Sequence, residues 1–296
     1  MGAARVSETA DVGGVAISNP DKVWWPDDGT TKGDIARYYL EVADLIRPWM
    51  QDRPLTAERC PDGMLGGCFY RKNFPEGNIP AKAPRLRLRA ESTGKDVNYV
   101  VGGTLDALLG FVRVGCITMH VMNSRVGTMH EADWLAFDLD PSSGEFADAA
   151  RAGRALRTVL DEHKLASFPK TSGSRGLHVF VALKPGQSQE IVTAYAVGVG
   201  QELARREPEL VTMEWRKNAR GGRVYADSFR NAYLQTIATP YSVRRRPHAP
   251  VSTPLDWDEV TPKLDPATFT IRTLAKRVAK TDPWKDFARR AVQLPT

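Results

Sequence analysis

Residues 131–142 read EADWLAFDLDPS, and the candidate site is inferred from this stretch. The segment 134–139 is apolar except for one carboxylate and is followed closely by a proline, a pattern that predicts a short β-strand. Side chains alternate along a strand, so Asp138 and Asp140 project from the same face with their Cα atoms about 7 Å apart. Carboxylates this close repel unless a cation lies between them, and hard oxygen ligands suit Mg²⁺ or Mn²⁺. The alternative is a strand end with solvated or helix-capping acids.

The composition indicates a folded protein. The chain has 296 residues, 42% hydrophobic and 26% charged, which excludes a disordered chain. Its net charge of +6 permits a nucleic-acid partner but also fits an ordinary basic protein. Cys60, Cys68 and Cys116 match neither a disulfide framework nor a zinc site, which predicts a reducing compartment. With no apolar leader and no uncharged apolar span, we expect a cytoplasmic protein without a membrane partner.

Hydrophobic periodicity predicts a mixture of helices and strands along the chain. The segment 1–14 is small and polar, which predicts a loose end, and 263–296 is expected to be helical and basic. Thr31 and Asp34 resemble a capping box at the start of the first helix. The predicted helices are 32–50, 104–112, 144–163 and 191–206, and the predicted strands are 83–101, 117–122, 166–169, 177–183 and 223–227.

The second informative stretch is KTSGSRGLHVFVAL, residues 170–183. Its loop, 172–176, combines small residues with Arg175, and its two glycines let backbone N–H groups approach an anion. His178 projects from the polar face of the strand that follows. The loop could equally be a hairpin turn. However, it lies one helix and one strand after the acid pair, which is the order that a metal–triphosphate site requires.

Three further residues are candidates on weaker patterns. Asp227 ends a predicted strand and is a candidate third carboxylate, with a turn residue as the alternative. His120 faces away from the apolar side of its strand, although an isolated histidine there is usually structural. Arg220 belongs to a basic stretch, 216–223, and we assign it to DNA binding.

Two groups of residues near the N-terminus suit nucleic acid. Lys22 and Lys32 flank a loop before a helix, where backbone N–H groups could hold a phosphate, although solvated surface lysines are the alternative. Phe69 and Tyr70 precede Arg71 and Lys72, and aromatic side chains beside basic ones can stack a base and bind its backbone. The alternative has one ring in the core and the basic residues in water.

Five ordered motifs resemble the polymerase domain of bacterial ligase D and its stand-alone relatives, within the archaeo-eukaryotic primase superfamily. They are NPDKVWWP with TTKGDI, LAFDLDPS, SGSRGLHVF, GGRVYADSFRN and IATPYSVRRR. The resemblance covers residues 15–260 and implies an α+β fold, with two packed parts and mixed or antiparallel sheets around a cleft. One part would be similar to an RNA-recognition module. We expect one catalytic domain over 1–296, with a DNA-binding part (15–125), a metal- and nucleotide-binding part (131–260) and a C-terminal helical segment (263–296).

The resemblance also implies an activity. It is template-directed addition of nucleotides to primer 3′ ends at DNA gaps or double-strand-break ends, in non-homologous end joining. The cofactors would be two Mn²⁺ or Mg²⁺ ions, and the substrates would be nucleoside triphosphates, with ribonucleotides preferred over deoxyribonucleotides. The implied partners are gapped, overhanging or 5′-phosphorylated DNA, together with Ku and a DNA ligase.

The resemblance assigns roles by position. Asp138, Asp140 and Asp227 match the catalytic, metal-binding acids. The residues that match nucleotide contacts are His120, Ser172, Arg175, His178 and Arg244. The residues assigned to DNA or its 5′-phosphate are Lys22, Lys32, Arg59, Phe69, Tyr70, Lys72 and Arg220.

This chain departs from the family pattern at three places. Arg175 replaces the usual lysine of the phosphate loop, and a planar guanidinium binds phosphate differently from an ammonium group. Ala57 and Glu58 replace residues that are often basic, which predicts a weaker grip on the 5′-phosphate. The segment 228–230, Ser-Phe-Arg, replaces the common Trp-Ser-Gln, which predicts an altered template or sugar preference.

Two other functions use the same residues. A metal-dependent nuclease or phosphodiesterase would need the acids but not the SGSRGLH loop or Arg244. A non-catalytic DNA-end-binding module would not need all three acids, which are present here.

Overall fold

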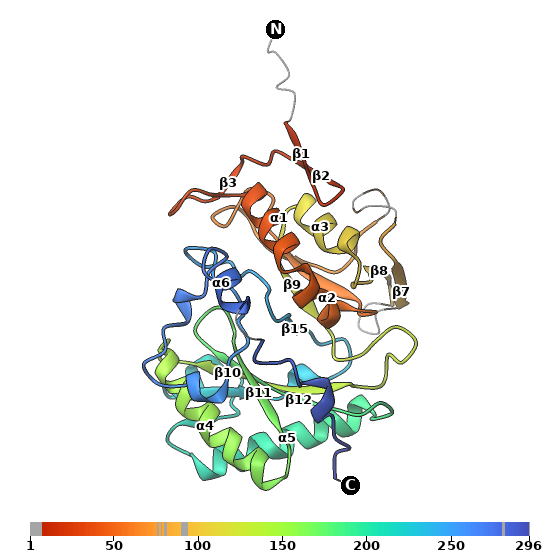
Figure 1. Ribbon diagram of the computed structural model, residues 1–296. Helices are drawn as coiled ribbons and strands as arrows, with labels where there is room; N and C mark the ends of the chain where they lie inside the picture. Colours follow the sequence, from red (N-terminus) through yellow and green to blue (C-terminus); the bar gives the residue numbers. More distant parts are fainter. Residues whose placement is uncertain are drawn as a thin grey trace.

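Two β-sheets organise the molecule, and each packs against helices on one side (Figure 1). The computed structural model describes residues 8–75, 77, 79, 82–89, 94–279 and 282–295. The first hydrophobic core joins the N-terminal helices to the smaller sheet, and the second joins two long helices to the larger sheet. The fold is therefore mixed α+β, as the sequence predicts. None of the helices in these described ranges is long and apolar enough to cross a membrane.

The larger sheet carries the acid pair. Its strands are antiparallel except for the last pair, and α4 (Phe146–Glu162) and α5 (Gln189–Arg206) cover one face. Alternation along β10 places Leu135, Phe137 and Leu139 in the second core and its two acids on the opposite face, where Trp134 and Ala136 join the first core. In spatial order the strands are β11 (Ser167–Thr171), β12 (Leu177–Ala182), β10 (Trp134–Pro141), β14 (Val224–Asp227) and β13 (Val211–Thr212).

The smaller sheet belongs to the N-terminal part. Its strands are antiparallel, and α1 (Lys32–Glu41), α2 (Ala43–Met50) and α3 (Leu105–Arg113) share the first core with it. In spatial order the strands are β15 (Ile237–Ala238), β9 (Cys116–Val121), β5 (Leu55–Arg59) and β6 (Phe69–Arg71).

Three hairpins complete the strand inventory of the described ranges, and two of them correct the sequence predictions. The N-terminal end is not loose from Thr9 onward, because β1 (Thr9–Val12) pairs with β2 (Val15–Ser18). The segment 83–101 is a hairpin of β7 (Arg85–Arg89) and β8 (Asp96–Val100) rather than one strand. The third hairpin joins β3 (Val23–Trp25) to β4 (Thr30–Thr31). Residues 1–7 and 90–93, on which parts of these predictions fall, lie outside the described ranges.

Two helical predictions are also corrected. The predicted helix over 32–50 has the expected capping box at its start but is divided at Val42, whose ψ of 12° ends α1. A β-branched residue loses side-chain freedom in a helix, which makes it a weak point in a long one. The described residues of 263–296 (263–279 and 282–295) form one short helix, α6 (Leu274–Val278), and two single 3₁₀ turns, η4 (Pro266–Thr268) and η5 (Ala288–Arg290). This segment is held instead by side-chain packing, in which Trp284 and Phe287 join the first core.

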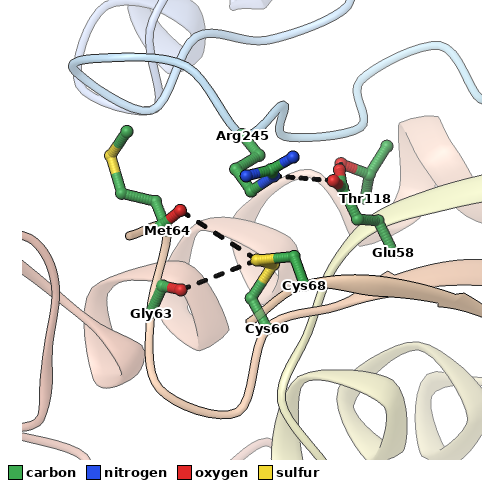
Figure 2. Close-up of a disulfide and its surroundings, with 7 residues drawn as sticks. All are labelled: Glu58, Cys60, Gly63, Met64, Cys68, Thr118 and Arg245. Carbon is green, nitrogen blue, oxygen red and sulfur yellow. Dashed lines mark hydrogen bonds and ion pairs between the residues drawn. A yellow bond between two sulfur atoms is a disulfide. The ribbon is translucent and has the colours of Figure 1, made fainter. Parts of the chain in front are cut away.

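The cysteine prediction is wrong for two of the three residues. Cys60 and Cys68 form a disulfide, with their Cα atoms 4.4 Å apart (Figure 2). They lie at the two ends of the loop that joins the antiparallel strands β5 and β6, so the turn brings them together. Cys116 is free and buried.

Candidate active site

One row of directly opposed residues crosses four strands of the larger sheet. Lys170 on β11 pairs with His178 on β12, His178 pairs with Asp138 on β10, and Asp138 pairs with Asp227 on β14. Directly opposed residues on neighbouring strands project from the same face. Asp140 is two residues further along β10 and shares that face. The sheet register therefore brings all three predicted acids and His178 together.

An arginine accompanies the acids on each side. Arg230 Nε lies 2.9 Å from Asp227 Oδ2 and 3.8 Å from Asp138 Oδ2. Arg220 Nη1 lies 3.4 Å from Asp140 Oδ2. The guanidinium of Arg220 is fixed by two backbone carbonyls and by the Tyr225 ring, 4.1 Å away. Arg220, which was predicted to bind DNA, is therefore at the acid edge and not beside Lys22 and Lys32.

The three carboxylates have different electrostatic environments. Burial alone would raise the pKa of Asp138, but His178, Arg230 and Arg244 together hold it well below its ordinary value. Burial and the charge of Asp138 raise the pKa of Asp140, against the opposing effect of Arg220. Burial also raises the pKa of Asp227, which Arg230 opposes. Asp138 is thus the most firmly ionised of the three.

The acids are suited to a divalent cation in their chemistry. Carboxylate oxygens are hard donors of the kind that Mg²⁺ and Mn²⁺ prefer. A guanidinium already lies against both Asp138 and Asp227, so this edge attracts positive charge. Within the part of the chain that the structure describes, no three acidic, histidine or cysteine side chains converge as a preformed metal centre. A metal ion at these acids would compete with Arg230 and Arg220 for the carboxylates.

The loop 172–176 is tightly folded between β11 and β12. The Ser172 side chain accepts hydrogen bonds from the N–H groups of Ser174 and Gly176, both at 3.1 Å, and so closes the loop on itself. Gly173 has φ +71°, which favours glycine, and a Cβ at Gly176 would lie 2.6 Å from the Leu139 carbonyl oxygen. The tight path of this loop between β11 and β12 therefore requires glycine at both positions.

A cavity of about 500 Å³ lies between the two sheets, above the row of acids. Three of its cations, Lys72, Arg175 and Arg244, make no ion pair with a carboxylate in the described ranges. It combines most of the predicted catalytic and nucleotide-contact residues. Those that line it are Tyr70, Lys72, His120, Asp138, Asp140, Ser172, Arg175, His178 and Arg244.

The two histidines of the cavity are neutral at pH 7. Burial, with a further contribution from Lys170, lowers the pKa of His178 to about 4. Burial and the charge of Arg244 lower the pKa of His120 well below its ordinary value. His120 Nδ1 is buried without a hydrogen-bond partner in the described part of the chain, and Tyr70 contacts the ring edge-on at 5.3 Å. An unsatisfied buried nitrogen at a cavity wall is suited to a ligand.

A second group of predicted residues lies apart from this cavity. Lys22 Nζ donates to Asp62 Oδ1 (2.7 Å) and to a backbone carbonyl. Lys32 is buried, and its Nζ donates to the carbonyls of Ser18 (2.9 Å) and Arg113 (2.8 Å). Burial, followed by the charges of Lys22 and Arg113, lowers the pKa of Lys32 to about 8. Two neighbouring cations whose one carboxylate partner among the described residues, Asp62, is exposed make a site suited to a phosphate.

The neighbouring strands β5 and β6 show why Glu58 does not oppose these lysines. The Arg59 guanidinium lies over the Phe69 ring at 5.8 Å, on one side of the strands. Glu58 projects to the other side, where it accepts hydrogen bonds from Arg245 (2.7 Å) and Thr118 (3.3 Å), as Figure 2 shows. The acidic replacement is therefore neutralised within the protein.

Two residues of the site were not singled out as functional from the sequence. Lys170 belongs to the quoted KTSGSRG stretch. An antiparallel hairpin centred on Ser174 pairs Lys170 with His178, so the sequence could have indicated this contact. Arg230 was noticed only as a departure from the family pattern. Its contact with two acids depends on the turn after β14, and no local pattern indicates it.

The chain is similar to proteins of one known family. The chain matches the family described as "LigD, primase-polymerase domain" over residues 31–284. The multifunctional non-homologous end joining protein LigD of Mycolicibacterium smegmatis is 35% identical over 254 residues, which are 83% of this chain and 32% of that protein. Its counterpart in Pseudomonas aeruginosa is 30% identical over 301 residues, 97% of this chain and 34% of that protein. The chain thus spans about a third of the length of these curated relatives.

A solved structure shows the same architecture. The polymerase domain of Mycobacterium tuberculosis ligase D in complex with DNA superposes with a TM-score of 0.86 at 31% sequence identity, and the match covers 94% of this chain and 99% of that one. The chain therefore belongs to the family of LigD primase-polymerase domains, which confirms the resemblance inferred from its five motifs.

Proposed function

We propose that this chain is a template-directed nucleotidyltransferase that extends primer 3′ ends at DNA gaps or double-strand-break ends in non-homologous end joining. The observation that carries the proposal is the charge arrangement of one cavity. Asp138 and Asp140 lie on one wall, and Arg175 and Arg244, which have no carboxylate partner in the described ranges, also line it. A triphosphate satisfies such cations, while the acids remain available for a divalent ion.

The nucleotide would be held by groups from both sheets. Arg175 and Arg244 offer charge to the phosphates, and Ser172 and Gly176 of the loop 172–176 line the same cavity. His178 is neutral at pH 7, so it acts as a hydrogen-bond donor and not as a cation. Tyr70 and Lys72, at the mouth of the cavity on the smaller sheet, are placed to contact the template base and its backbone.

Asp138, Asp140 and Asp227 would hold the divalent ions, two Mn²⁺ or Mg²⁺ by analogy with other nucleotidyl transfer sites. When bound, such ions lower the pKa of a primer 3′-hydroxyl and offset charge on the triphosphate. Before they bind, Arg220 and Arg230 screen the repulsion between the acids. These arginines must release the carboxylates when the site is loaded.

The second cationic group is proposed to bind the 5′-phosphate on the far side of a gap. Lys22 and Lys32 are adjacent, since the Lys32 amide donates to the Lys22 carbonyl at 2.9 Å. A phosphate would replace Asp62 as the partner of Lys22 and compensate the buried charge of Lys32. Phe69, covered by Arg59, offers a stacking surface beside this site. A preference for ribonucleotides and association with Ku and a DNA ligase extend the same proposal.

The test is extension of a labelled primer on a gapped duplex that carries a downstream 5′-phosphate. Mn²⁺ or Mg²⁺ and ribo- or deoxynucleotides are supplied in parallel, and the double variant Asp138→Ala/Asp140→Ala is the matched control. We expect templated addition by the wild type, stronger with ribonucleotides, and none by the variant. The variant should keep its fold, because both substitutions lie on the cavity face and leave Leu135, Phe137 and Leu139 in the second core; thermal unfolding checks this.

Other outcomes would contradict the proposal in distinct ways. Metal-dependent shortening of the primer without nucleoside triphosphate would indicate a nuclease. Tight binding to the gap without any product would indicate an end-binding module. Full extension by the double variant would remove the acids from the mechanism.

A further inference from the structure

Lys170 is fully buried at one end of the charged row, and the proposed reaction gives it no role. Its Nζ contacts His178 and Ser252, and none of its contacts in the described ranges is a carboxylate. Burying a lysine nitrogen is unfavourable unless its protons are hydrogen-bonded. We propose that Lys170 is a positioning residue, which holds the His178 ring with its Nε2–H directed at Asp138 and the nucleotide cavity. The inference rests on the proposed function, because it concerns the same nucleotide site.

The contact with Ser252 shows that Lys170 is the donor. The Ser252 hydroxyl donates its single proton to the Thr171 carbonyl oxygen at 2.9 Å. Ser252 Oγ can therefore only accept from Lys170 Nζ. Ser252 is itself fully buried, and its amide donates to the Ser242 carbonyl, so this end of the row is fixed to the segment that follows β15.

The contact between His178 and Asp138 determines which ring nitrogen of His178 carries the proton. Its Nε2 lies 3.3 Å from Asp138 Oδ1, and an ionised carboxylate can only accept. Nε2 therefore carries the proton of the neutral ring, and Nδ1 has a free lone pair. Lys170 Nζ, 2.8 Å from Nδ1, supplies the matching donor. Both an ammonium group and a neutral amine have enough protons for these two bonds, so the assignment does not depend on the charge of Lys170.

This order of donors has a consequence for nucleotide binding. His178 lines the cavity together with Ser172 and Arg175, so its Nε2–H is the group that can be offered to a phosphate oxygen. With the proton on Nδ1, the ring would present a lone pair to Asp138 and to any phosphate, and both contacts would be repulsive. Lys170 excludes that arrangement, because its own protons occupy the Nδ1 side.

A purely structural role is the alternative, since Lys170 also joins β11 to the segment around Ser252 and Pro254. Two variants separate the roles. Lys170→Met keeps the apolar length of the side chain and removes the donor. Ser252→Ala removes the link to the neighbouring segment and keeps the Lys170–His178 contact.

The decisive measurement is the tautomer of His178 by ¹⁵N NMR of the imidazole nitrogens in the DNA-free protein near pH 7.5. The chain has five histidines, and the variant His178→Gln identifies the signal by its loss. We expect the Nε2–H form in the wild type and in Ser252→Ala, and a mixture or the Nδ1–H form in Lys170→Met. Calorimetry with ATP and Mg²⁺ should show about tenfold weaker binding by Lys170→Met, the loss of about one hydrogen bond.

Each outcome decides the question. An Nδ1–H tautomer in the wild type would overturn the proposal, even if Lys170→Met fails to fold. An unchanged tautomer and unchanged ATP binding in folded Lys170→Met would reduce Lys170 to a structural role, as would an equal change in Ser252→Ala. The tautomer is measured without catalysis, so a wild type that fails to extend a primer refutes the proposed function and not this inference.

Discussion

Arg230 lies where the proposed metal ions must bind, so its removal should strengthen metal binding by a predictable amount. The variant Arg230→Gln removes the guanidinium that contacts Asp227 at 2.9 Å and Asp138 at 3.8 Å. Unit charges about 3–4 Å apart attract by roughly 1 kcal/mol in water and by several times more in a protein interior. The Arg230 side chain is 39% exposed, so the value near that of water applies to each contact. The two contacts together contribute about 1–2 kcal/mol.

A metal ion that binds these acids has to overcome that attraction. We therefore expect Arg230→Gln to bind Mn²⁺ roughly 5- to 30-fold more tightly than the wild type. The assay is titration of free Mn²⁺ by electron paramagnetic resonance, without DNA or nucleotide, so that catalysis does not enter. Arg216→Gln is the matched control, because it also removes one positive charge from the neighbouring basic stretch but has no carboxylate contact in the described ranges.

Unchanged or weaker Mn²⁺ binding by Arg230→Gln would refute the reasoning. It would mean that Arg230 stabilises the acids in the geometry that the metal uses instead of competing with it. An equal gain in Arg216→Gln would assign the effect to net charge and not to the contact.

Two further predictions concern the N-terminal part. The pKa of Lys32 is lowered to about 8, so Lys32 is protonated below that pH and loses its charge above it. The preference for a gap with a 5′-phosphate over one with a 5′-hydroxyl should therefore fall between pH 7 and 9. A constant ratio of the dissociation constants for the two gaps over this range would contradict the assignment. Reduction of the Cys60–Cys68 disulfide should lower the free energy of unfolding by about 2–3 kcal/mol, because the bond restricts a short loop in the unfolded chain. Urea unfolding with and without dithiothreitol measures this, and Cys60→Ser/Cys68→Ser should show no response to the reductant.

Much of the larger sheet was predictable from local patterns. The alternation in 134–139 predicts a strand with its acids on one face, and β10 has that arrangement. The apolar stripe in 144–163 predicts a helix, and α4 buries that stripe. Such predictions succeed because a strand or helix that buries one face has apolar residues at the spacing of that element. The pairing of Lys170 with His178 was accessible in the same way, from the register of the hairpin between them.

Other features were misjudged because they depend on weak local preferences. The division at Val42 reflects a small difference in helix propensity, which surrounding contacts can override. The C-terminal segment 263–296, which carries Trp284 and Phe287, was predicted to be helical and basic. Both aromatic side chains are buried in the first core, but most of the backbone around them is irregular and is held by packing and by hydrogen bonds to distant segments.

The sequence by itself determined the long helices and central strands of the larger sheet, the family and the face from which Asp138, Asp140 and His178 project. These follow from periodicity and from motifs that are contiguous in the chain. Only the tertiary structure decided that Cys60 joins Cys68, that Arg220 contacts Asp140 and that Arg230 lies against two acids. Those contacts depend on turns, on side-chain rotamers and on the packing of distant segments, and none of these leaves a periodic trace in the chain.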